Sequence, residues 1–269
     1  MNVKESTTDY TSCPTPSQEV CKFVIKLESD FEGDVYFYYA LDNYFQNHRR
    51  YMKSRSDSQL LGDLQNVADC TPYAYMNTSL GLKVIAPCGA VANSMFNDTF
   101  SLYRNESADP VPWTYRGVVW DVDKNKRYRN PPGKNLKQAF AKTVKPPNWQ
   151  KAIYELDPYD SDNNGFLNTD FIIWMRTAAL PDFRKLYRIL VRNKDKVYEN
   201  GLPSGTYHLI VKSNYPVTVF GGRKYFIIST TSWAGGKNSF LGITYIIVGS
   251  ICIALGAIFL LIHLKFGTL

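Results

Sequence analysis

Residues 240–262 read FLGITYIIVGSICIALGAIFLLI, a run of 23 residues without a charged, amide or proline side chain. An α-helix of this length extends about 35 Å and can cross the ~30 Å hydrocarbon core of a bilayer. A buried helix of a soluble protein would carry a polar face over the same length. The run therefore predicts one membrane-spanning helix, with its flanks at residues 237–265 and a cytosolic stub at residues 266–269.

Residues 1–236 precede this helix and contain all of the chain's acidic residues and most of its aromatic ones. No part of them is polar and aromatic-poor enough to indicate disorder, so we expect one large water-exposed domain. The formal net charge of the chain is +7 at pH 7, but the basic residues form no dense run. A solvated surface explains this modest surplus, and we expect no nucleic-acid partner.

Four of the five cysteines lie in this domain, at Cys13, Cys21, Cys70 and Cys88, while Cys252 lies in the apolar run. An even count predicts two disulfides, and proximity in the sequence favours Cys13–Cys21 and Cys70–Cys88 over the two crossed pairings. Zinc is the alternative, but zinc sites use closely spaced cysteine pairs, which this chain lacks. We therefore expect disulfides and no metal.

Three N-glycosylation acceptor sequences begin at Asn77, Asn97 and Asn105. Together with paired cysteines they predict an oxidising lumen or the cell exterior for residues 1–236. Residues 1–20 are polar and contain two prolines, so they do not form a signal peptide. A lone C-terminal span would leave the preceding domain in the cytosol. We therefore expect that a further membrane span precedes this sequence.

The polar domain shows strand patterns near both of its ends. Residues 21–27 alternate, and residues 35–41 are aromatic with high β-propensity. Late strands are expected at 206–212 and 224–231, and a short strand at 117–121. These patterns predict a mainly β (α+β) fold, an antiparallel β-sandwich-like domain that closes its first strands against its last.

Helical patterns lie between these strands, at residues 43–51, 171–180 and 183–190. Asn168 or Thr169 is expected to cap the helix at 171–180, and Asp182 to cap the next. The arginine at position 176 interrupts an apolar helix, which predicts a buried guanidinium with a carboxylate or carbonyl partner.

The sequence contains few residues that could form a catalytic or metal-binding site. Asp160–Leu167 matches the first eight positions of a calcium-binding EF-hand loop, but Phe171 stands where the bidentate glutamate should be. We interpret this segment as an Asx-type turn. The three histidines have no metal-ligand spacing, and no catalytic or nucleotide-binding motif is present. We therefore expect a protein that is not an enzyme and holds no cofactor.

Three glycines recur every seven residues inside the apolar run, at Gly242, Gly249 and Gly256. Seven residues return to nearly the same face of a helix, so these glycines form one smooth stripe. Because helices in lipid associate through close approach at small residues, the stripe predicts contact with a partner helix. The alternative is that glycine is simply common in such helices.

Several ordered runs of this sequence closely resemble the transmembrane-protein-30 family, also called cell-division-control-protein-50. The resemblance extends from about Phe31 to the C-terminus. The matching runs are Asn47–Tyr51, Ser54–Leu60, Ala86–Gly89, Asn93–Thr99, Asp162–Phe166, Trp174–Pro181, Phe183–Tyr187, Asn214–Val217, Gly222–Lys224 and Gly235–Asn238.

The resemblance implies a non-catalytic β subunit of a type IV P-type ATPase, a pump that flips phospholipids. It implies a heterodimer with the catalytic subunit, a role in its exit from the endoplasmic reticulum and in its transport cycle, and a glycosylated outer domain. The locations implied are the endoplasmic reticulum, Golgi, secretory vesicles and plasma membrane. In this reading Trp233 anchors the lumenal interface.

This sequence departs from the family pattern in two places. It lacks the first membrane span, and it carries only Cys13 and Cys21 near the first strand, where family members carry four cysteines.

Two further hypotheses for the function are a stand-alone ligand-binding or lectin-like membrane receptor and a calcium-regulated membrane enzyme.

Overall fold

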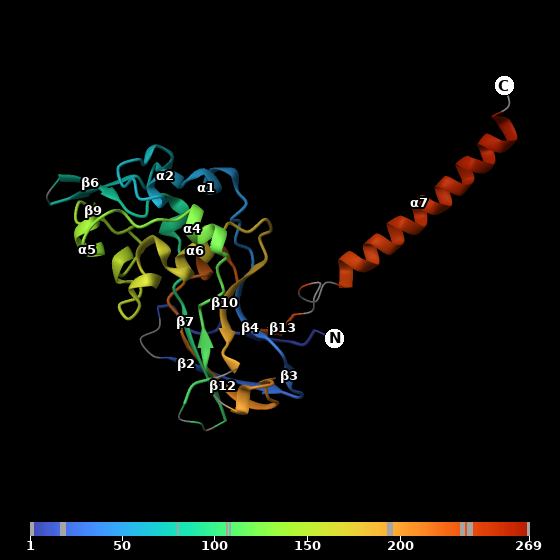
Figure 1. Cartoon of the computed structure of the whole chain (residues 1–269), viewed down its shortest axis with the longest axis horizontal. Coiled ribbons are helices and arrows are strands. Elements are labelled where there is room, and N and C mark those ends of the chain that lie inside the picture. The colour runs from blue at the N-terminus through green and yellow to red at the C-terminus, as the bar shows by residue number, and fades with distance from the viewer. Residues whose placement is uncertain are drawn as a thin grey trace. The chain divides into compact units, whose positions relative to one another are not determined.

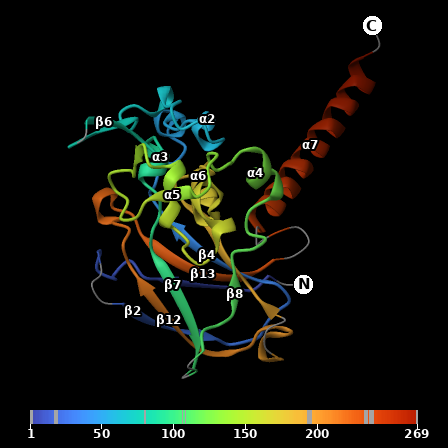
Figure 2. The ribbon, with the colours of Figure 1, turned by 60° about the vertical axis from the view of Figure 1, so that its left-hand side comes forward.

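Two antiparallel sheets form the body of this computed structural model, which describes residues 3–16, 20–79, 81–105, 107, 109–192, 196–231, 235 and 239–267 (Figures 1 and 2). The first sheet has the order β1 (Glu5–Asp9), β13 (Lys224–Thr230), β4 (Val35–Leu41), β10 (Phe183–Leu190) and β8 (Trp113–Thr114). The second has the order β2 (Cys21–Leu27), β12 (Gly205–Lys212) and β7 (Thr99–Arg104). The predicted mainly β, antiparallel fold is confirmed.

Aromatic side chains from both sheets fill the space between the layers. The Phe100 ring of β7 lies 5.0 Å from the Phe226 ring of β13 and 5.2 Å from the Tyr187 ring of β10. Phe37 of β4 packs on the same Phe226 ring at 6.1 Å. Such pairs add stability beyond the apolar area that they bury. The aromatic content of the strands therefore builds the core that joins the two sheets.

The first strands of the chain close against the last, as predicted. β1 pairs with β13 from Glu5 opposite Ser229, and β2 pairs with β12 from Cys21 opposite Val211. β13 also pairs with β4 along its whole length. These pairings hold the two ends of residues 5–230 in one compact unit.

Most of the chain between β4 and β10 covers one end of the sandwich (Figure 1). It contains the short helices α1 (Arg49–Lys53), α2 (Asp57–Leu60), α3 (Ala90–Asn93), α4 (Asp121–Lys126), α5 (Leu136–Ala139) and α6 (Thr169–Met175). It also contains a small sheet of β5 (Tyr75–Thr78), β6 (Gly81–Ile85) and β9 (Thr143–Val144), in which β6 and β9 run parallel. A second small pair joins β3 (Phe31–Glu32) to β11 (Gly201–Leu202).

The prediction of a helix at residues 183–190 is wrong, because these residues form strand β10 in the first sheet. A β-bulge between Leu186 and Arg188 breaks the pairing with β4. One extra residue shifts the two-residue alternation and places apolar residues at helical spacing. The bulge thus imitated the pattern of an amphipathic helix.

Three shorter elements also differ from expectation. The helix expected at 171–180 is α6 (Thr169–Met175), which Asn168 caps by accepting a hydrogen bond from the Phe171 N–H. Only the end of the helix expected at 43–51 is helical, within α1 at Arg49–Lys53, and residues 117–121 form no strand.

The guanidinium of Arg176 is not buried, because its side chain remains 44% exposed. It lies over the Trp120 ring, and its Nη1 atom is 3.3 Å from an Asp123 oxygen. The expected carboxylate partner is therefore present, but at the surface. An exposed pair of this kind contributes little to stability.

The last helix, α7 (Ser239–Phe266), belongs to a second unit of the chain, formed by residues 1–4 and 231–269. Residues 242–266 are long and apolar enough to cross a membrane, and none of the most apolar window is buried by the rest of the structure. Most of their apolar side chains are well exposed. α7 is therefore a candidate membrane anchor.

Candidate functional site

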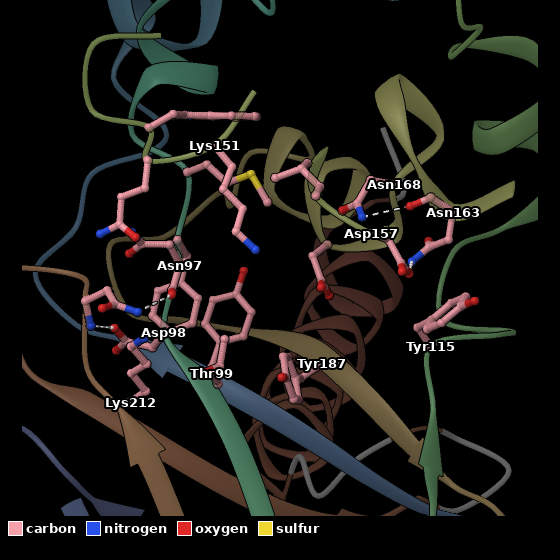
Figure 3. Close-up of a pocket in the computed structure, with 18 of the residues that line it drawn as sticks. Asn97, Asp98, Thr99, Tyr115, Lys151, Asp157, Asn163, Asn168, Tyr187 and Lys212 are labelled. Carbon is pink, nitrogen blue, oxygen red and sulfur yellow. Dashed lines mark hydrogen bonds between the residues drawn. The ribbon is translucent and has the colours of Figure 1, made fainter. Parts of the chain in front are cut away.

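A polar pocket of about 420 Å³ lies between the first sheet and the helical end of the sandwich (Figure 3). Its base includes Tyr39 of β4 with Tyr187 and Arg188 of β10. One wall is formed by residues 95–99 and 148–151, and the facing wall by Tyr115, Asp157, Asn163, Asn168 and Asp170. With Lys212 and Asn214, seven separate parts of the sequence thus meet around one cavity.

A bidentate ion pair lies at the base of the pocket. Arg188 donates from Nη1 and Nη2 to the two oxygens of Asp170, at 2.6 and 3.0 Å. Burial by itself lowers the pKa of Arg188, but the Asp170 carboxylate outweighs it and raises this pKa above its ordinary value. The guanidinium therefore stays charged and occupied by its partner.

The facing wall is held together by its own hydrogen bonds. Asn163 donates to Asp157 at 2.7 Å, and Asn168 donates to the Asn163 carbonyl at 2.9 Å. Next to them, the Asp160 side chain accepts from the Asp162 N–H at 2.9 Å. This confirms the Asx-type turn. In the part of the chain that the structure describes, no three acidic, histidine or cysteine residues gather as metal ligands.

The other wall is fixed by a buried carboxylate. Asp98 accepts from Lys224 Nζ at 2.8 Å, from the Tyr10 hydroxyl at 3.1 Å and from the Tyr215 N–H at 2.6 Å. Burial lowers the pKa of Lys224, and the Asp98 carboxylate opposes that shift. The segment that begins at Asn97 is therefore anchored to the core of the sandwich.

The wall also presents polar groups that the protein leaves unpaired. Asn97 Oδ1 is the one buried side-chain oxygen or nitrogen without a hydrogen-bond partner among the described residues. The side chains of Asn148, Gln150 and Lys151 likewise make no hydrogen bond within the described chain. Figure 3 shows Lys151 reaching into the cavity. The polar groups of the Asp157–Asn168 wall are thus hydrogen-bonded within the protein, whereas the open wall of residues 95–99 and 148–151 has polar groups that can bind a ligand.

The LEM3 (ligand-effect modulator 3) family / CDC50 family matches this chain over residues 1–268. The chain belongs to that family. It is 50% identical to mouse cell cycle control protein 50A, over 98% of this chain and 77% of that protein. It is 47% identical to human cell cycle control protein 50B, over 91% of this chain and 71% of that protein. It is also 38% identical to putative ALA-interacting subunit 4 of Arabidopsis thaliana, over 91% and 66% of the two chains.

The three acceptor asparagines of this family member have different surroundings. Asn77 is exposed on β5, and Asn105 is exposed with a φ of 48°. Asn97 is half-buried and lines the pocket. The structure thus brings one of the three sequence-predicted sites to the cavity and leaves two on the open surface. Their glycosylation stays a prediction.

The cysteines pair as proximity in the sequence favours. Cys13 is bonded to Cys21 with a Cα–Cα distance of 6.0 Å, and Cys70 to Cys88 with one of 5.6 Å. The first bond holds the N-terminal segment to the start of β2. The second is buried in a separate small core with Val67, Ala74, Val84 and Ile85. Neither disulfide lines the pocket.

The glycine stripe lies on α7 and is open in this structure. A Cβ atom placed at Gly242, Gly249 or Gly256 would meet nothing within 4 Å. The predicted contact with a partner helix remains a prediction. Trp233, the expected interfacial anchor, lies outside the described residues.

Sequence reasoning missed the pocket as a site. Its residues come from segments that are distant in the chain, and several are ordinary surface types such as Gln150 and Lys151. The acceptor sequence at Asn97 was the one local signal among them. The lining offers amides, aromatic rings and paired charges, and no histidine or cysteine is among the residues that line it. Amides, rings and paired charges of this kind can bind a polar ligand.

Proposed function

We propose that this chain is a non-catalytic accessory subunit of a type IV P-type ATPase that flips phospholipids. Membership of the LEM3/CDC50 family carries the proposal. A plant relative named a putative ALA-interacting subunit supports a role in binding another protein. The composition of the pocket is in keeping with binding, since no nucleophile–base pair lines it.

The proposed arrangement places residues 1–236 in the lumen or outside the cell, residues 237–265 in the membrane and residues 266–269 in the cytosol. Glycans on Asn77, Asn97 and Asn105 belong to this arrangement. Two disulfides in residues 1–236 and the apolar helix α7 support it. The compartments are the endoplasmic reticulum, Golgi, secretory vesicles or plasma membrane.

The subunit acts as a heterodimer with its ATPase, escorts that ATPase out of the endoplasmic reticulum and supports its transport cycle. The pump holds ATP and the lipid path. In the membrane, the stripe of Gly242, Gly249 and Gly256 packs against a helix of the pump, because the absence of side chains allows the backbones to approach closely.

Co-expression with a type IV P-type ATPase tests this function. We expect the two chains to co-purify, and ATPase exit from the endoplasmic reticulum and lipid flipping to fall when this chain is left out. Gly249→Leu should reduce the co-purified ATPase roughly fivefold, equivalent to about 1 kcal/mol. Ala254→Leu, which places the same side chain on another side of α7, should leave the yield unchanged. Equal yields for both variants would remove the stripe from the interface.

The open wall of the pocket favours a second candidate, a stand-alone ligand-binding or lectin-like membrane receptor. Unpaired amides at Asn97, Asn148 and Gln150 are groups that bind hydroxylated ligands. This function predicts delivery of the full chain to the cell surface without any ATPase. Retention in the endoplasmic reticulum until a pump is supplied would exclude it.

A further inference from the structure

We propose that the pocket holds the first N-acetylglucosamine of a glycan attached to Asn97, as a built-in site for the protein's own sugar. The inference takes from the proposed function only that Asn97 is glycosylated. In that modification the C1–oxygen bond of a lipid-diphosphate-linked sugar donor breaks, and C1 bonds to the amide nitrogen. The displaced amide proton leaves with the phosphate group.

The backbone holds Asn97 at the pocket wall in a defined position. Its carbonyl accepts from Asn214 Nδ2 at 3.0 Å, and the next residue, Asp98, is locked into the buried cluster with Lys224. Asn97 Oδ1 is enclosed and unpaired, whereas its amide nitrogen is neither bonded nor enclosed. The exposed Thr99 completes the acceptor sequence at the start of β7 and also lines the pocket. The attachment atom therefore lies where a sugar can enter the cavity.

The pocket matches a neutral, hydroxyl-rich ring in charge and chemistry. Arg188 is paired with Asp170, and Asp98 with Lys224, so these charges are already compensated. The free groups are mostly amides, which both donate and accept hydrogen bonds as sugar hydroxyls do. Lys151 and Lys212 also line the cavity without an ion pair among the described residues, and a lysine ammonium can donate to sugar hydroxyls as well. The open amide wall accordingly favours a saccharide.

The volume and the covalent attachment point to the first sugar. The cavity of about 420 Å³ lies at the small end of the range for ligand pockets, which suits one or two sugar rings. A covalently attached ring has a high effective concentration, so weak contacts with Asn148 and Gln150 are sufficient to dock it. Asn77 and Asn105 are exposed and do not line this cavity.

The test uses the full chain, purified in detergent from cells that make high-mannose glycans and trimmed with endoglycosidase H to one sugar per site. Mass spectrometry establishes occupancy of Asn97. Thr99→Val removes that acceptor and keeps a β-branched residue in β7, and Asn77→Gln is the matched control. We expect Thr99→Val to lower Tm by about 3 °C or more. Trimming and Asn77→Gln should leave Tm unchanged.

A double-mutant comparison separates docking from a general effect of glycans. Asn148→Ala with Gln150→Ala should lower Tm in the glycosylated protein and leave it unchanged in the Thr99→Val background. Additive losses, or an unoccupied Asn97, would overturn the proposal. The proposal is also overturned if the Tm losses are additive and free N-acetylglucosamine binds to the Thr99→Val protein. The pocket would then bind a sugar from another molecule. None of these readouts depends on the ATPase.

Discussion

Two lysines are buried among the residues that the structure describes, and their surroundings differ. Lys224 starts β13 and is 0% exposed, and its ammonium donates to Asp98, Ser213 and the Tyr215 carbonyl within 2.9 Å. Lys185 lies on β10 and is 6% exposed. Its ammonium donates to three backbone carbonyls of residues 173, 174 and 176, at 2.9, 3.0 and 2.5 Å. In the first region, around Lys224, a carboxylate pairs with the ammonium. In the second region, around Lys185, the carbonyls at the end of helix α6 accept hydrogen bonds from it.

The difference shows two ways of burying a charge. A carboxylate within hydrogen-bond distance compensates a buried ammonium directly, so removing either partner leaves the other stranded. The C-terminus of a helix supplies only partial negative charge from unpaired carbonyls. Burial first, and the nearby Arg176 second, lower the pKa of Lys185 to about 7. The Lys224 region is thus a paired charge, while the Lys185 region is a charge held by dipoles.

The sharpest way to break the first region is Lys224→Met, which leaves the Asp98 carboxylate buried without its cation. We expect the free energy of unfolding to fall by about 3–5 kcal/mol, measured by urea denaturation of the purified chain. Adding Asp98→Asn to Lys224→Met should recover part of the loss, because the neutral amide needs no cation. A loss below about 1 kcal/mol would show that the pair does not hold the sheets together.

Lys185→Met tests the second region and should have a smaller effect. It leaves the last carbonyls of α6 without a donor but strands no opposite charge, so we expect a loss of about 1–3 kcal/mol in the same assay. Lys26→Met on the exposed face of β2 is the control and should stay within about 0.5 kcal/mol of wild type. A loss as large as that of Lys224→Met would contradict the comparison.

The pH dependence of stability should sharpen the comparison further. Burial lowers the pKa of Lys185 in the folded protein to about 7. Above that pH, Lys185 is protonated in the unfolded chain but has lost its proton in the folded protein. Unfolding free energy should therefore rise by about 1 kcal/mol between pH 7.5 and pH 8.5 relative to Lys185→Met. Parallel curves for the two proteins would show that Lys185 remains charged throughout this range.

The strands at the two ends of the domain were predictable from local pattern. β2 and β4 have the predicted bounds, since their aromatic and β-branched residues fit one pleated, half-buried surface. β10 was not predictable in the same way. Its bulge broke the alternation, and Lys185 points inward, where sequence reasoning places apolar residues. The competing effect was tertiary, because the α6 carbonyls make an internal lysine tolerable.

The pocket was still less predictable. Its acceptor sequence at Asn97 could be read directly, but neither Lys151 nor Asn148 carries any local mark of a site. Their proximity to Asn97 depends on how the loops between β4 and β10 fold over the sandwich. Loop positions of this kind follow from packing rather than from periodicity.

The amino-acid sequence by itself determined the apolar helix, the strands that close the sandwich, the preferred cysteine pairing and the resemblance to a family. These depend on residue type and short-range spacing, which are printed in the chain. The tertiary structure alone decided that residues 183–190 form a strand, that Lys185 and Lys224 are buried and that Asn97 lines a cavity. Those outcomes depend on which distant groups can satisfy a buried charge or hydrogen bond, and only the folded chain brings such groups together.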